Sequence, residues 1–394
     1  MSKKLLTSEI GKIVSKIKKW NPIQSSQEEQ FHYIDLGSVD QKEKRIVGAP
    51  KINPKEAPSR ARQIVYSGDV LVSTVRPNLN GVAYVPKKYN GATASTGFCV
   101  LRPKQGYLDS RYLYHWVKTA KFREEMVKFA TRASYPAISD RIVKDSEIPF
   151  PSLEEQKRIA TILDKADAIR RKRQQSIKLA DDFLRATFLD MFGDPITNPK
   201  GWDVALLKKV ASFENGDRSS NYPSGSDIKK EGVLFVSTKN ILNNNFCLDE
   251  TKFITKEKFE SLSRGKLKQG DLIITLRGTL GSCCIFESGY KTGFINAQIM
   301  IIRPNKKSNA VFLHAFLTSD PIQAILKRIG QGAAVPQLTA KQLSEFMIPF
   351  PPIELQKQFA NVLSNTKKLQ AKMMKNDVVQ LFNSLTQRAF RGEL

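Results

Sequence analysis

Two stretches of the chain place apolar residues three and four positions apart, which is the spacing of one face of an α-helix. The first stretch follows Pro151 and the second follows Pro351. Prolines stop the preceding strand, and the glutamates just after them suit the positive end of a helix dipole. The apolar stripe is narrow, as in a coiled coil, so each helix needs a partner. The residues predicted to form this seam are Ile159, Leu163, Ala166, Ile169, Phe359, Leu363, Leu369 and Met373.

The same ten-residue phrase introduces both helices. Residues 148–157 read IPFPSLEEQK, and residues 348–357 read IPFPPIELQK. Such an echo indicates that the chain consists of two copies of one unit. A helix of roughly 39 residues is near 58 Å long at about 1.5 Å per residue and needs tertiary packing. If the copies are related by a pseudo-twofold axis, the two helices pack together and run antiparallel.

The segments before the helices mix strand and helix patterns. Runs at 68–74 and 270–275 predict matching strands, 82–85 and 98–103 a hairpin, and 6–20 and 110–130 helices. The fold class predicted is therefore α+β, with two tandem domains of mixed sheet plus helices joined by two long antiparallel coiled-coil spacer helices in a pseudo-twofold arrangement. The expected boundaries are 1–151 for the first domain, 152–192 for the central helix, 193–351 for the second domain and 352–394 for the distal helix.

Charge favours a polyanionic partner. The 394 residues include 63 Lys plus Arg against 38 Asp plus Glu, a net charge of +25 that both globular regions share. The plainer interpretation is a protein that is merely basic. No apolar run reaches the roughly 20 residues of a membrane span, and the N-terminus lacks the apolar core of a signal peptide. We expect a cytoplasmic protein without a membrane partner.

No metal or catalytic site is predicted. The four cysteines form no Cys-x-x-Cys pair, and the three histidines lie far from them in the sequence. His115 and His314 stand in apolar helical stretches and are interpreted as structural. Glu154 with Gln156, and Glu354 with Gln356, fall in a first helical turn, where capping or interdomain hydrogen bonding is a better explanation than acid–base chemistry.

Loops after the matched strands carry donors and acceptors suited to nucleic acid. Arginine suits guanine and asparagine suits adenine, whereas lysines suit phosphates. An ordinary polar turn is the alternative for each. The candidates for base contact are Arg76, Asn78, Asn80, Arg277 and Thr279. The candidates for backbone contact are Lys87, Lys88, Arg132, Lys239, Asn240, Lys291, Arg328 and Gln331.

Three phrases together carry a family resemblance. They are the repeated IPFPxxExQ, the passage MFGDPxxNPKGW at 191–202 and the terminal AFRGEL at 389–394. With the tandem layout, they make the chain similar to the specificity subunit of type I restriction-modification systems, over its whole length. The resemblance implies a DNA-binding subunit with no catalytic activity of its own. Its two target-recognition domains would each read one half of a bipartite site in double-stranded DNA.

The resemblance also implies partners. The spacer helices would set the gap between the half-sites and dock two adenine methyltransferase subunits, and the complete assembly would add restriction subunits. Cofactors would belong to those partners: S-adenosylmethionine, and ATP with Mg²⁺ in the full complex. The outer faces of the two helices are where methyltransferase subunits would dock. The target bases are not implied, because the recognition loops are the variable part of the family.

Two rival classes remain to be tested. A methyltransferase acting alone would need a glycine-rich cofactor loop and an Asn/Asp-Pro-Pro-Tyr/Phe motif; the closest segment, 220–223, lacks the double proline. No Gly-Lys-Ser/Thr phosphate loop is present, so ATP hydrolysis is unsupported. An RNA-binding adaptor or a structural dimeriser would also be basic, but neither explains why the two copies differ chiefly in their loops. Preferential binding of this chain to duplex DNA with two separated sequence determinants would distinguish a specificity subunit from these alternatives.

Overall fold

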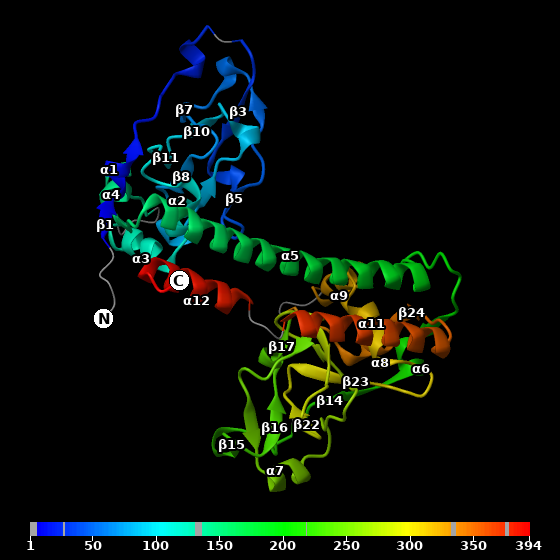
Figure 1. The fold of residues 1–394 in the computed structure, drawn as a ribbon. Helices are drawn as coiled ribbons and strands as arrows, with labels where there is room; N and C mark the ends of the chain where they lie inside the picture. Colours follow the sequence, from blue (N-terminus) through cyan, green and yellow to red (C-terminus); the bar gives the residue numbers. More distant parts are fainter. Residues whose placement is uncertain (1–5, 27, 131–135, 218, 332–335, 375–377) are drawn as a thin grey trace. The chain divides into compact units, whose positions relative to one another are not determined.

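The computed structural model describes residues 6–26, 28–130, 136–217, 219–331, 336–374 and 378–394. They form two compact units. The first comprises Met1–Gln175 with Met374–Leu394, and the second comprises Ser176–Met373. One long helix, α5 (Leu153–Phe192), contributes its first part to one unit and its second part to the other (Figure 1).

The first unit contains two four-stranded sheets, ordered β6-β3-β10-β7 and β2-β11-β8-β9, and the pairs β1-β12 and β4-β5. Its strands are β1 (Thr7–Glu9), β2 (Val14–Ser15), β3 (Phe31–Ile34), β4 (Val39–Asp40), β5 (Arg45–Ile46), β6 (Lys51–Ile52), β7 (Ala61–Ile64), β8 (Val70–Ser73), β9 (Val82–Tyr84), β10 (Thr93–Ser95), β11 (Phe98–Pro103) and β12 (Glu147–Pro149). Its other helices are α1 (Ile10–Ile13), α2 (Ser110–Val117), α3 (Ala120–Lys128), α4 (Asp140–Asp145) and α12 (Val378–Arg391).

The second unit repeats this plan, with sheets ordered β15-β19-β16-β22 and β14-β23-β20-β21 and the pairs β13-β24 and β17-β18. Its strands are β13 (Val204–Leu206), β14 (Ala211–Asn215), β15 (Ile228–Lys229), β16 (Val233–Val236), β17 (Ile241–Leu242), β18 (Asn245–Phe246), β19 (Lys252–Ile254), β20 (Leu272–Thr275), β21 (Cys283–Ile285), β22 (Gly293–Ile295), β23 (Ile299–Pro304) and β24 (Met347–Pro349). Its other helices are α6 (Leu207–Val210), α7 (Lys256–Ser261), α8 (Ala310–Thr318), α9 (Asp320–Gly330), α10 (Ala340–Ser344) and α11 (Ile353–Met374). Short 3₁₀ helices complete the two units: η1 (Pro22–Gln24), η2 (Leu36–Ser38), η3 (Pro54–Glu56), η4 (Pro77–Leu79), η5 (Lys87–Tyr89), η6 (Gly225–Asp227) and η7 (Thr238–Asn240).

The repeat extends to strand direction. In each unit one sheet contains a single parallel pair, β3 with β10 and β16 with β22, among antiparallel neighbours. The other sheet is wholly antiparallel, and its inner strand β8 or β20 has antiparallel partners on both sides. The expected α+β fold with two tandem mixed domains and long spacer helices is confirmed. The sheet β2-β11-β8-β9 recurs strand for strand as β14-β23-β20-β21, and the strands β6-β3-β10 of the other sheet recur as β19-β16-β22, whose fourth strand differs between the units.

Three local predictions are wrong. The expected helix 110–130 is two helices, α2 and α3, and the Thr119 side chain caps the start of the second. The segment 6–20 is not one helix, because it divides into β1, the single turn α1 and β2, whose strands pair with β12 and β11. Segments 82–85 and 98–103 do not form a hairpin, because β8 lies between β9 and β11 and pairs with both. The strands β9 and β11 are therefore not neighbours in the sheet.

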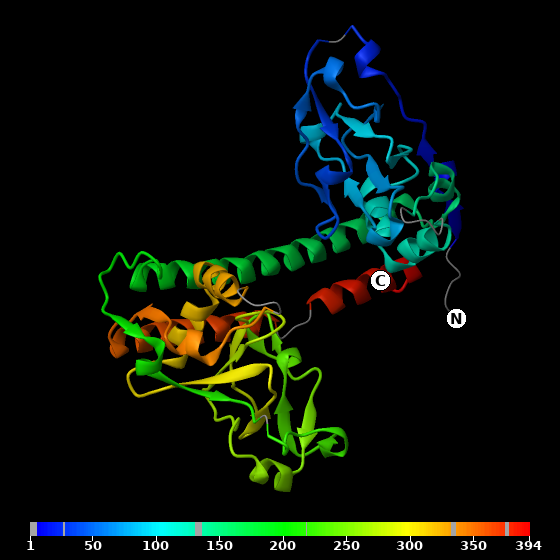
Figure 2. The same ribbon diagram turned by 180° about the vertical axis from the view of Figure 1, so that it is seen from behind.

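In the first unit, α12 packs beside the first part of α5 and runs antiparallel to it (Figures 1 and 2). Phe390, near the end of α12, contacts Tyr112 and Trp116 of α2, with ring centroids 5.1 Å apart in both pairs. The backbone oxygen of Leu394 accepts a hydrogen bond from Arg158 at 2.9 Å. The C-terminal helix therefore belongs to the core of the first unit.

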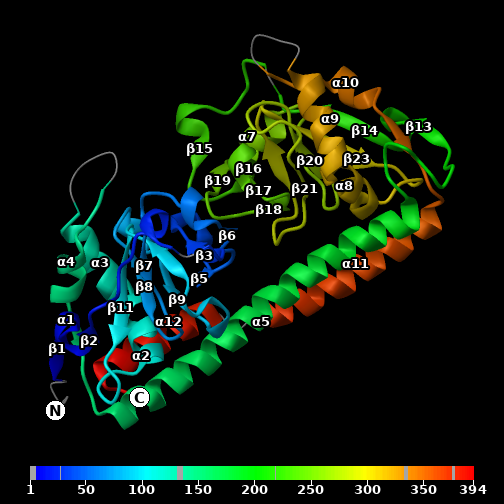
Figure 3. The same ribbon diagram turned by 90° about the horizontal axis from the view of Figure 1, so that it is seen from above.

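In the second unit, α11 runs antiparallel to the second part of α5 (Figure 3). Phe359 lies between Phe188 and Phe192 of α5, with ring centroids 5.6 and 5.5 Å away. Further along α11, Gln370 donates hydrogen bonds to Asp181 and to the backbone oxygen of Ile177. The distal spacer is thus divided between the units, α11 in the second and α12 in the first.

The predicted seam needs two corrections. Ile159, Leu163 and Phe359 are buried, and Ala166, Leu363 and Met373 are partly buried. Ile169 and Leu369 are instead 59% and 54% exposed. The prediction from regular apolar spacing assumed one continuous seam, whereas each half of the long helix packs against the helices of its own unit. Near Ile169, the buried residue is Asp167.

Candidate nucleic-acid interface

The loop after β8 is shaped by left-handed backbone at two places. Arg76 has φ 51° and Asn80 has φ 46°, on either side of η4. The backbone N–H of Arg76 donates to the backbone oxygen of Pro136 at 2.7 Å. Lys44 Nζ donates to the backbone oxygens of Leu79 and Asn80 at 3.2 and 2.6 Å. Arg76 and Asn78 are thereby held on an exposed, ordered turn.

In the matching loop after β20, the arginine occupies the position equivalent to residue 75, one residue before the position of Arg76 in the first unit. Val75 forms a β-bridge with Ala137, and in the second unit the equivalent bridge joins Arg277 to Gln337. Arg277 Nε also donates to Gln337 Oε1 at 3.1 Å. Arg277 is therefore the structural counterpart of Val75, and the two loops present their arginines differently.

Most predicted contact residues are exposed. They are Arg76, Asn78, Lys87, Lys88, Lys239, Arg277, Thr279, Lys291, Arg328 and Gln331. Lys88 lies over the Tyr89 ring at 4.6 Å, and Lys239 pairs with Glu250. Arg132 lies outside the described residues. Exposure alone does not bring these side chains together, and their role in DNA contact stays a prediction.

Asn80 and Asn240 are buried, at 7% and 1% exposed. Asn80 occupies a turn that tolerates left-handed backbone. Asn240 Oδ1 accepts from the backbone N–H of Ser237 at 2.9 Å, and its Nδ2 donates to the backbone oxygens of Cys247 and Glu250 at 3.0 and 3.3 Å. These buried side chains shape their loops from within, and their predicted contact with DNA does not fit this burial.

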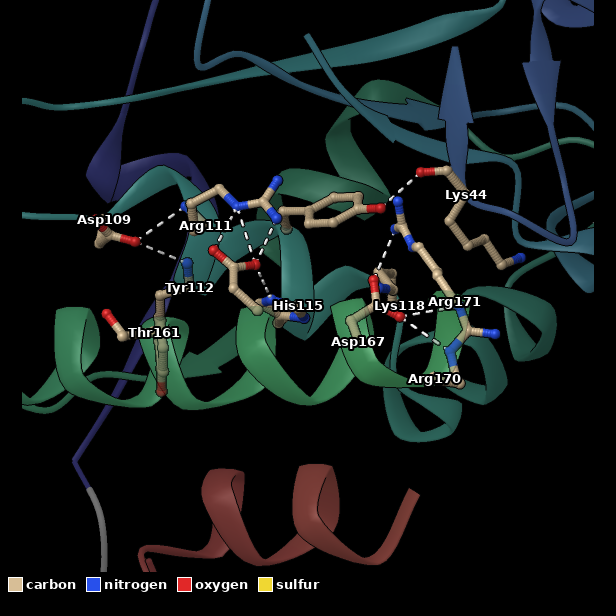
Figure 4. A network of polar contacts seen from close by, with 12 residues as sticks. Lys44, Asp109, Arg111, Tyr112, His115, Lys118, Thr161, Asp167, Arg170 and Arg171 are labelled. Carbon is tan, nitrogen blue, oxygen red and sulfur yellow. Dashed lines mark hydrogen bonds and ion pairs between the residues drawn. The ribbon is translucent and has the colours of Figure 1, made fainter. Parts of the chain in front are cut away.

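Charged residues fasten the first domain to its spacer helix (Figure 4). Arg111 and His115 of α2 both donate to Asp164 of α5, with Arg111 Nε 2.9 Å from Oδ2 and His115 Nε2 2.7 Å from Oδ1. Burial favours the neutral acid, but the hydrogen bonds from His115 and Arg111 hold the pKa of Asp164 well below its usual range. The carboxylate thus stays ionised and joins the two helices.

One turn further along α5, Asp167 forms ion pairs with three basic side chains (Figure 4). Lys118 Nζ lies 3.3 Å away, and Arg170 and Arg171 approach to 2.9 and 2.7 Å. Although burial opposes ionisation, Lys118 and Arg171 lower the pKa of Asp167, and burial lowers the pKa of Lys118 to about 8.

The 200-residue repeat places Ser364 and Lys367 at the positions of Asp164 and Asp167, so this pair of carboxylates belongs to the first unit alone. The apolar packing of Phe188, Phe192 and Phe359 against α8 corresponds instead to the contacts of Phe390 with α2 in the first unit.

A pH dependence follows from His115. Burial lowers the pKa of this imidazole despite its bond to Asp164, and Lys118 and Arg111 act in the same direction as burial. Between the folded pKa and the unfolded value of about 6.5, the unfolded chain binds more protons. We expect the midpoint of thermal unfolding to fall as the pH is lowered from 7.5 to 5.5. His115→Gln, which keeps a donor for Asp164, should reduce that fall, and His314 in the second unit, whose pKa burial also lowers, should account for the remainder. A midpoint that rises on acidification would contradict this.

The repeated glutamines brace the start of each spacer. Gln156 Oε1 accepts from the backbone N–H of Asp109 at 2.9 Å, and Gln356 Oε1 accepts from that of Asn309 at 2.9 Å. Their amide groups donate to the backbone oxygens of Pro151 and Pro351 at 3.0 and 2.7 Å. Both glutamines are fully buried. Each therefore orients a recognition domain relative to the helix that follows it, which confirms the prediction of hydrogen bonding rather than acid–base chemistry.

Sequence reasoning missed a pair of hairpins, β4–β5 and β17–β18, that border the two loops. The signal was present, because Asn243 and Asn244 form an Asn-Asn turn between short apolar runs. Among the described residues, no group of three His, Cys, Asp or Glu is placed to hold a metal ion. No described helix is long and apolar enough to cross a membrane.

A duplicated module with an ordered polar loop and a spacer helix defines a class of macromolecular recognition protein rather than a pocket enzyme. Comparison with known proteins identifies the class. The family model of the type I restriction modification DNA specificity domain matches residues 7–179 and 199–380. The chain belongs to this family. This confirms the resemblance and the expectation of a specificity subunit without catalysis of its own.

Known relatives share low identity over most of the chain. The MjaIX specificity subunit of Methanocaldococcus jannaschii is 24% identical over 336 residues, covering 80% of this chain and 74% of that protein. The EcoBI specificity subunit of Escherichia coli is 22% identical over 325 residues, covering 75% and 68%.

Solved structures confirm the fold. The S subunit of a type I restriction-modification system from M. genitalium aligns with a TM-score of 0.63 at 15% identity, covering 99% of this chain and 97% of that chain. A chain from a study of complex assembly and conformational transition in the type I R-M system aligns with a TM-score of 0.59 at 23% identity, over 100% of both chains. At these identities the likeness concerns the fold alone.

Proposed function

We propose that each unit reads one half of a bipartite site in double-stranded DNA. The observation that supports this most is the duplication itself: the family model matches each copy separately, and the two copies share the order of one four-stranded sheet and the hydrogen bonds of Gln156 and Gln356. Their exposed loops differ, as the placement of Arg76 and Arg277 illustrates. A framework repeated under different loops suits two modules that read different sequences.

The net charge of +25 supplies the attraction to phosphates that DNA binding requires. Exposed cations at Lys87, Lys88, Lys291 and Arg328 would position the duplex without reading it, and the loops at Arg76 and Arg277 would contact base edges. In this proposal the chain binds DNA and leaves the chemistry to its partners.

The spacer helices set the gap between half-sites in this proposal. Helix α5 has 40 residues, close to 60 Å at about 1.5 Å per residue. Half-sites read from one face of B-DNA lie about 34 Å apart, a distance that such a helix can span. A rigid helix in place of a flexible linker would give one fixed gap.

We further propose that the spacer helices dock two adenine methyltransferase subunits, and restriction subunits join in the full complex. Helix α5 exposes large apolar side chains at Leu179, Phe183 and Leu189, at 58%, 54% and 50%. Exposed apolar residues of this size on a paired helix suit a protein partner. The S-adenosylmethionine, ATP and Mg²⁺ of the reaction would be bound by those partners.

The test is single-molecule methylome sequencing of a host that expresses this chain with its cognate methyltransferase subunit. The proposal predicts adenine methylation at a split motif with a fixed gap, and loss of that methylation when this chain is omitted. Methylation at a continuous motif, or methylation independent of this chain, would refute it. Tighter binding to RNA than to duplex DNA containing the motif would favour the adaptor alternative.

A further inference from the structure

Each unit contains a short hairpin that borders its arginine loop. In β4–β5, Val39 pairs with Ile46, and both side chains are buried. In β17–β18, Ile241 pairs with Phe246, and both pack into the core formed around Ile273 and Phe286. The base of each hairpin is therefore anchored in its domain, and its turn projects from a fixed position.

Helix α2 in the first unit and helix α8 in the second hold the hairpin at the same backbone atom. Tyr114 of α2 donates its hydroxyl to the backbone oxygen of Lys44 at 2.6 Å (Figure 4). In the second unit His314 of α8 takes this place, with Nε2 3.0 Å from the backbone oxygen of Asn244. Lys44 and Asn244 both have left-handed backbone, with φ 55° and 58°. The two domains use different side chains to keep the same geometry.

Both hairpins are also tied to the neighbouring loop. Lys44 Nζ contacts the backbone oxygens of Leu79 and Asn80, and burial lowers the pKa of this ammonium group to about 8. In the second unit, Asn244 Oδ1 accepts from the backbone N–H of Cys283 at 3.3 Å, at the end of the Arg277 loop. Hydrogen bonds thus hold the hairpin and the loop together in each domain.

The turns at the tips of the hairpins are not conserved between the two copies. The first has four residues, Gln41–Lys44, with exposed Lys42 and with Arg45 exposed just beyond it. The second has only Asn243 and Asn244, at φ 49° and 58°, which is the left-handed pair of a tight hairpin turn. Asn243 and Asn245 are exposed, and Asn245 Nδ2 donates to the backbone oxygen of Asn243 at 2.9 Å, which orders that side chain.

We propose that these hairpin tips read bases, with Asn243 and Asn245 contacting the half-site of the second domain and Lys42 and Arg45 that of the first. A two-stranded ribbon fits the major groove, where asparagine pairs with adenine and arginine or lysine with guanine. The anchored bases and the divergent exposed tips are what such an element requires. This inference rests on the proposed function and adds a second reading element beside the arginine loop.

The test uses the intact chain with its methyltransferase subunit and compares methylated motifs. The variant combines Asn243→Gly with Asn245→Ala, because glycine keeps the left-handed backbone at 243 while removing the amide. Asn244 is left in place, since it holds the loop. We expect discrimination at one or two base positions of one half-site to fall about tenfold or more, with the other half and the gap unchanged.

Matched variants make the result specific. Lys42→Ala with Arg45→Ala should relax the other half-site. Asn221→Ala, an exposed asparagine whose neighbour Tyr222 packs in a separate cluster with Phe294, should leave the motif intact. Thermal unfolding midpoints equal to wild type would show that the variants are folded.

Two outcomes would overturn the inference while leaving the proposed function in place. One is an unchanged motif in the hairpin variants while the wild-type chain gives a split motif. The other is uniform weakening of methylation at all sites, which would mean phosphate contact without base reading. A wild-type motif that is not split would refute the proposed function itself.

Discussion

Alanine in place of Phe359 is expected to destabilise the second unit by about 3–5 kcal/mol, the usual cost of emptying a buried aromatic site. Phe359 is 1% exposed and lies between Phe188 and Phe192 of α5, which in turn contact Phe312 of α8. Its loss would open a cavity where spacer and recognition domain meet. Amide hydrogen exchange followed by mass spectrometry should show faster exchange throughout residues 176–373, while peptides of the first unit keep their protection.

The control lies on the same helix. Leu369 is 54% exposed. Leu369→Ala should therefore change the free energy of unfolding of the second unit, as measured by hydrogen exchange, by no more than about 0.5 kcal/mol. Equal effects of the two substitutions would mean that α11 packs through a continuous apolar seam, contrary to the structure.

The second large effect is expected at Asp167. Asp167→Ala should destabilise the first unit by about 3 kcal/mol, the lower end of the cost of removing one partner from a buried charge pair. The value falls at the lower end because the Arg171 side chain is 32% exposed and can regain water, whereas those of Lys118 and Arg170 are 11% and 15% exposed. The free energy is again measured by hydrogen exchange, here over residues 6–130 and the first part of α5.

Asp182 provides the matched control, because it is an exposed aspartate on the same helix. Asp182→Ala should be neutral within about 0.5 kcal/mol. If Asp167→Ala proves equally neutral, the cluster of charges is a solvated surface feature, and the first domain is attached to its spacer by apolar contacts alone.

The duplication could be predicted because one sequence motif, IPFPxxExQ, occurs twice in the chain, 200 residues apart. Gln156 and Gln356 recur since each satisfies a backbone N–H at the start of a helix, and no other residue type does so in the same geometry while also donating to a backbone oxygen. The order of strands was not predictable in the same way. Strands β9 and β11 lie close together along the chain, but β8, which precedes both, separates them in the sheet, and local patterns carry no information on such pairing.

For the candidate site, too, the sequence predicted some features, and only the structure shows the others. Arg76 and Arg277 were found because each follows a buried strand, but only the bridges to Ala137 and Gln337 show that they differ by one position in register. Asn240 has the residue type expected for base contact, yet the same amide is equally suited to holding a loop from inside, and burial decides between these roles. Ile169 was placed in the seam by spacing, whereas Asp167 is buried among Arg170 and Arg171 of its own helix and Lys118 of a distant segment.

The central claim is that each unit reads one half of a split site, and the most direct measurement is the methylome of hosts carrying Arg76→Ala or Arg277→Ala with the methyltransferase subunit. Alanine keeps the Cβ at both positions, so the backbone cost at Arg76 is little changed. The account predicts that each variant relaxes base preference, by about 1–3 kcal/mol, in one half only, and that the two variants affect opposite halves with the gap preserved. Relaxation of the same half by both variants, or of both halves by either one, would contradict it.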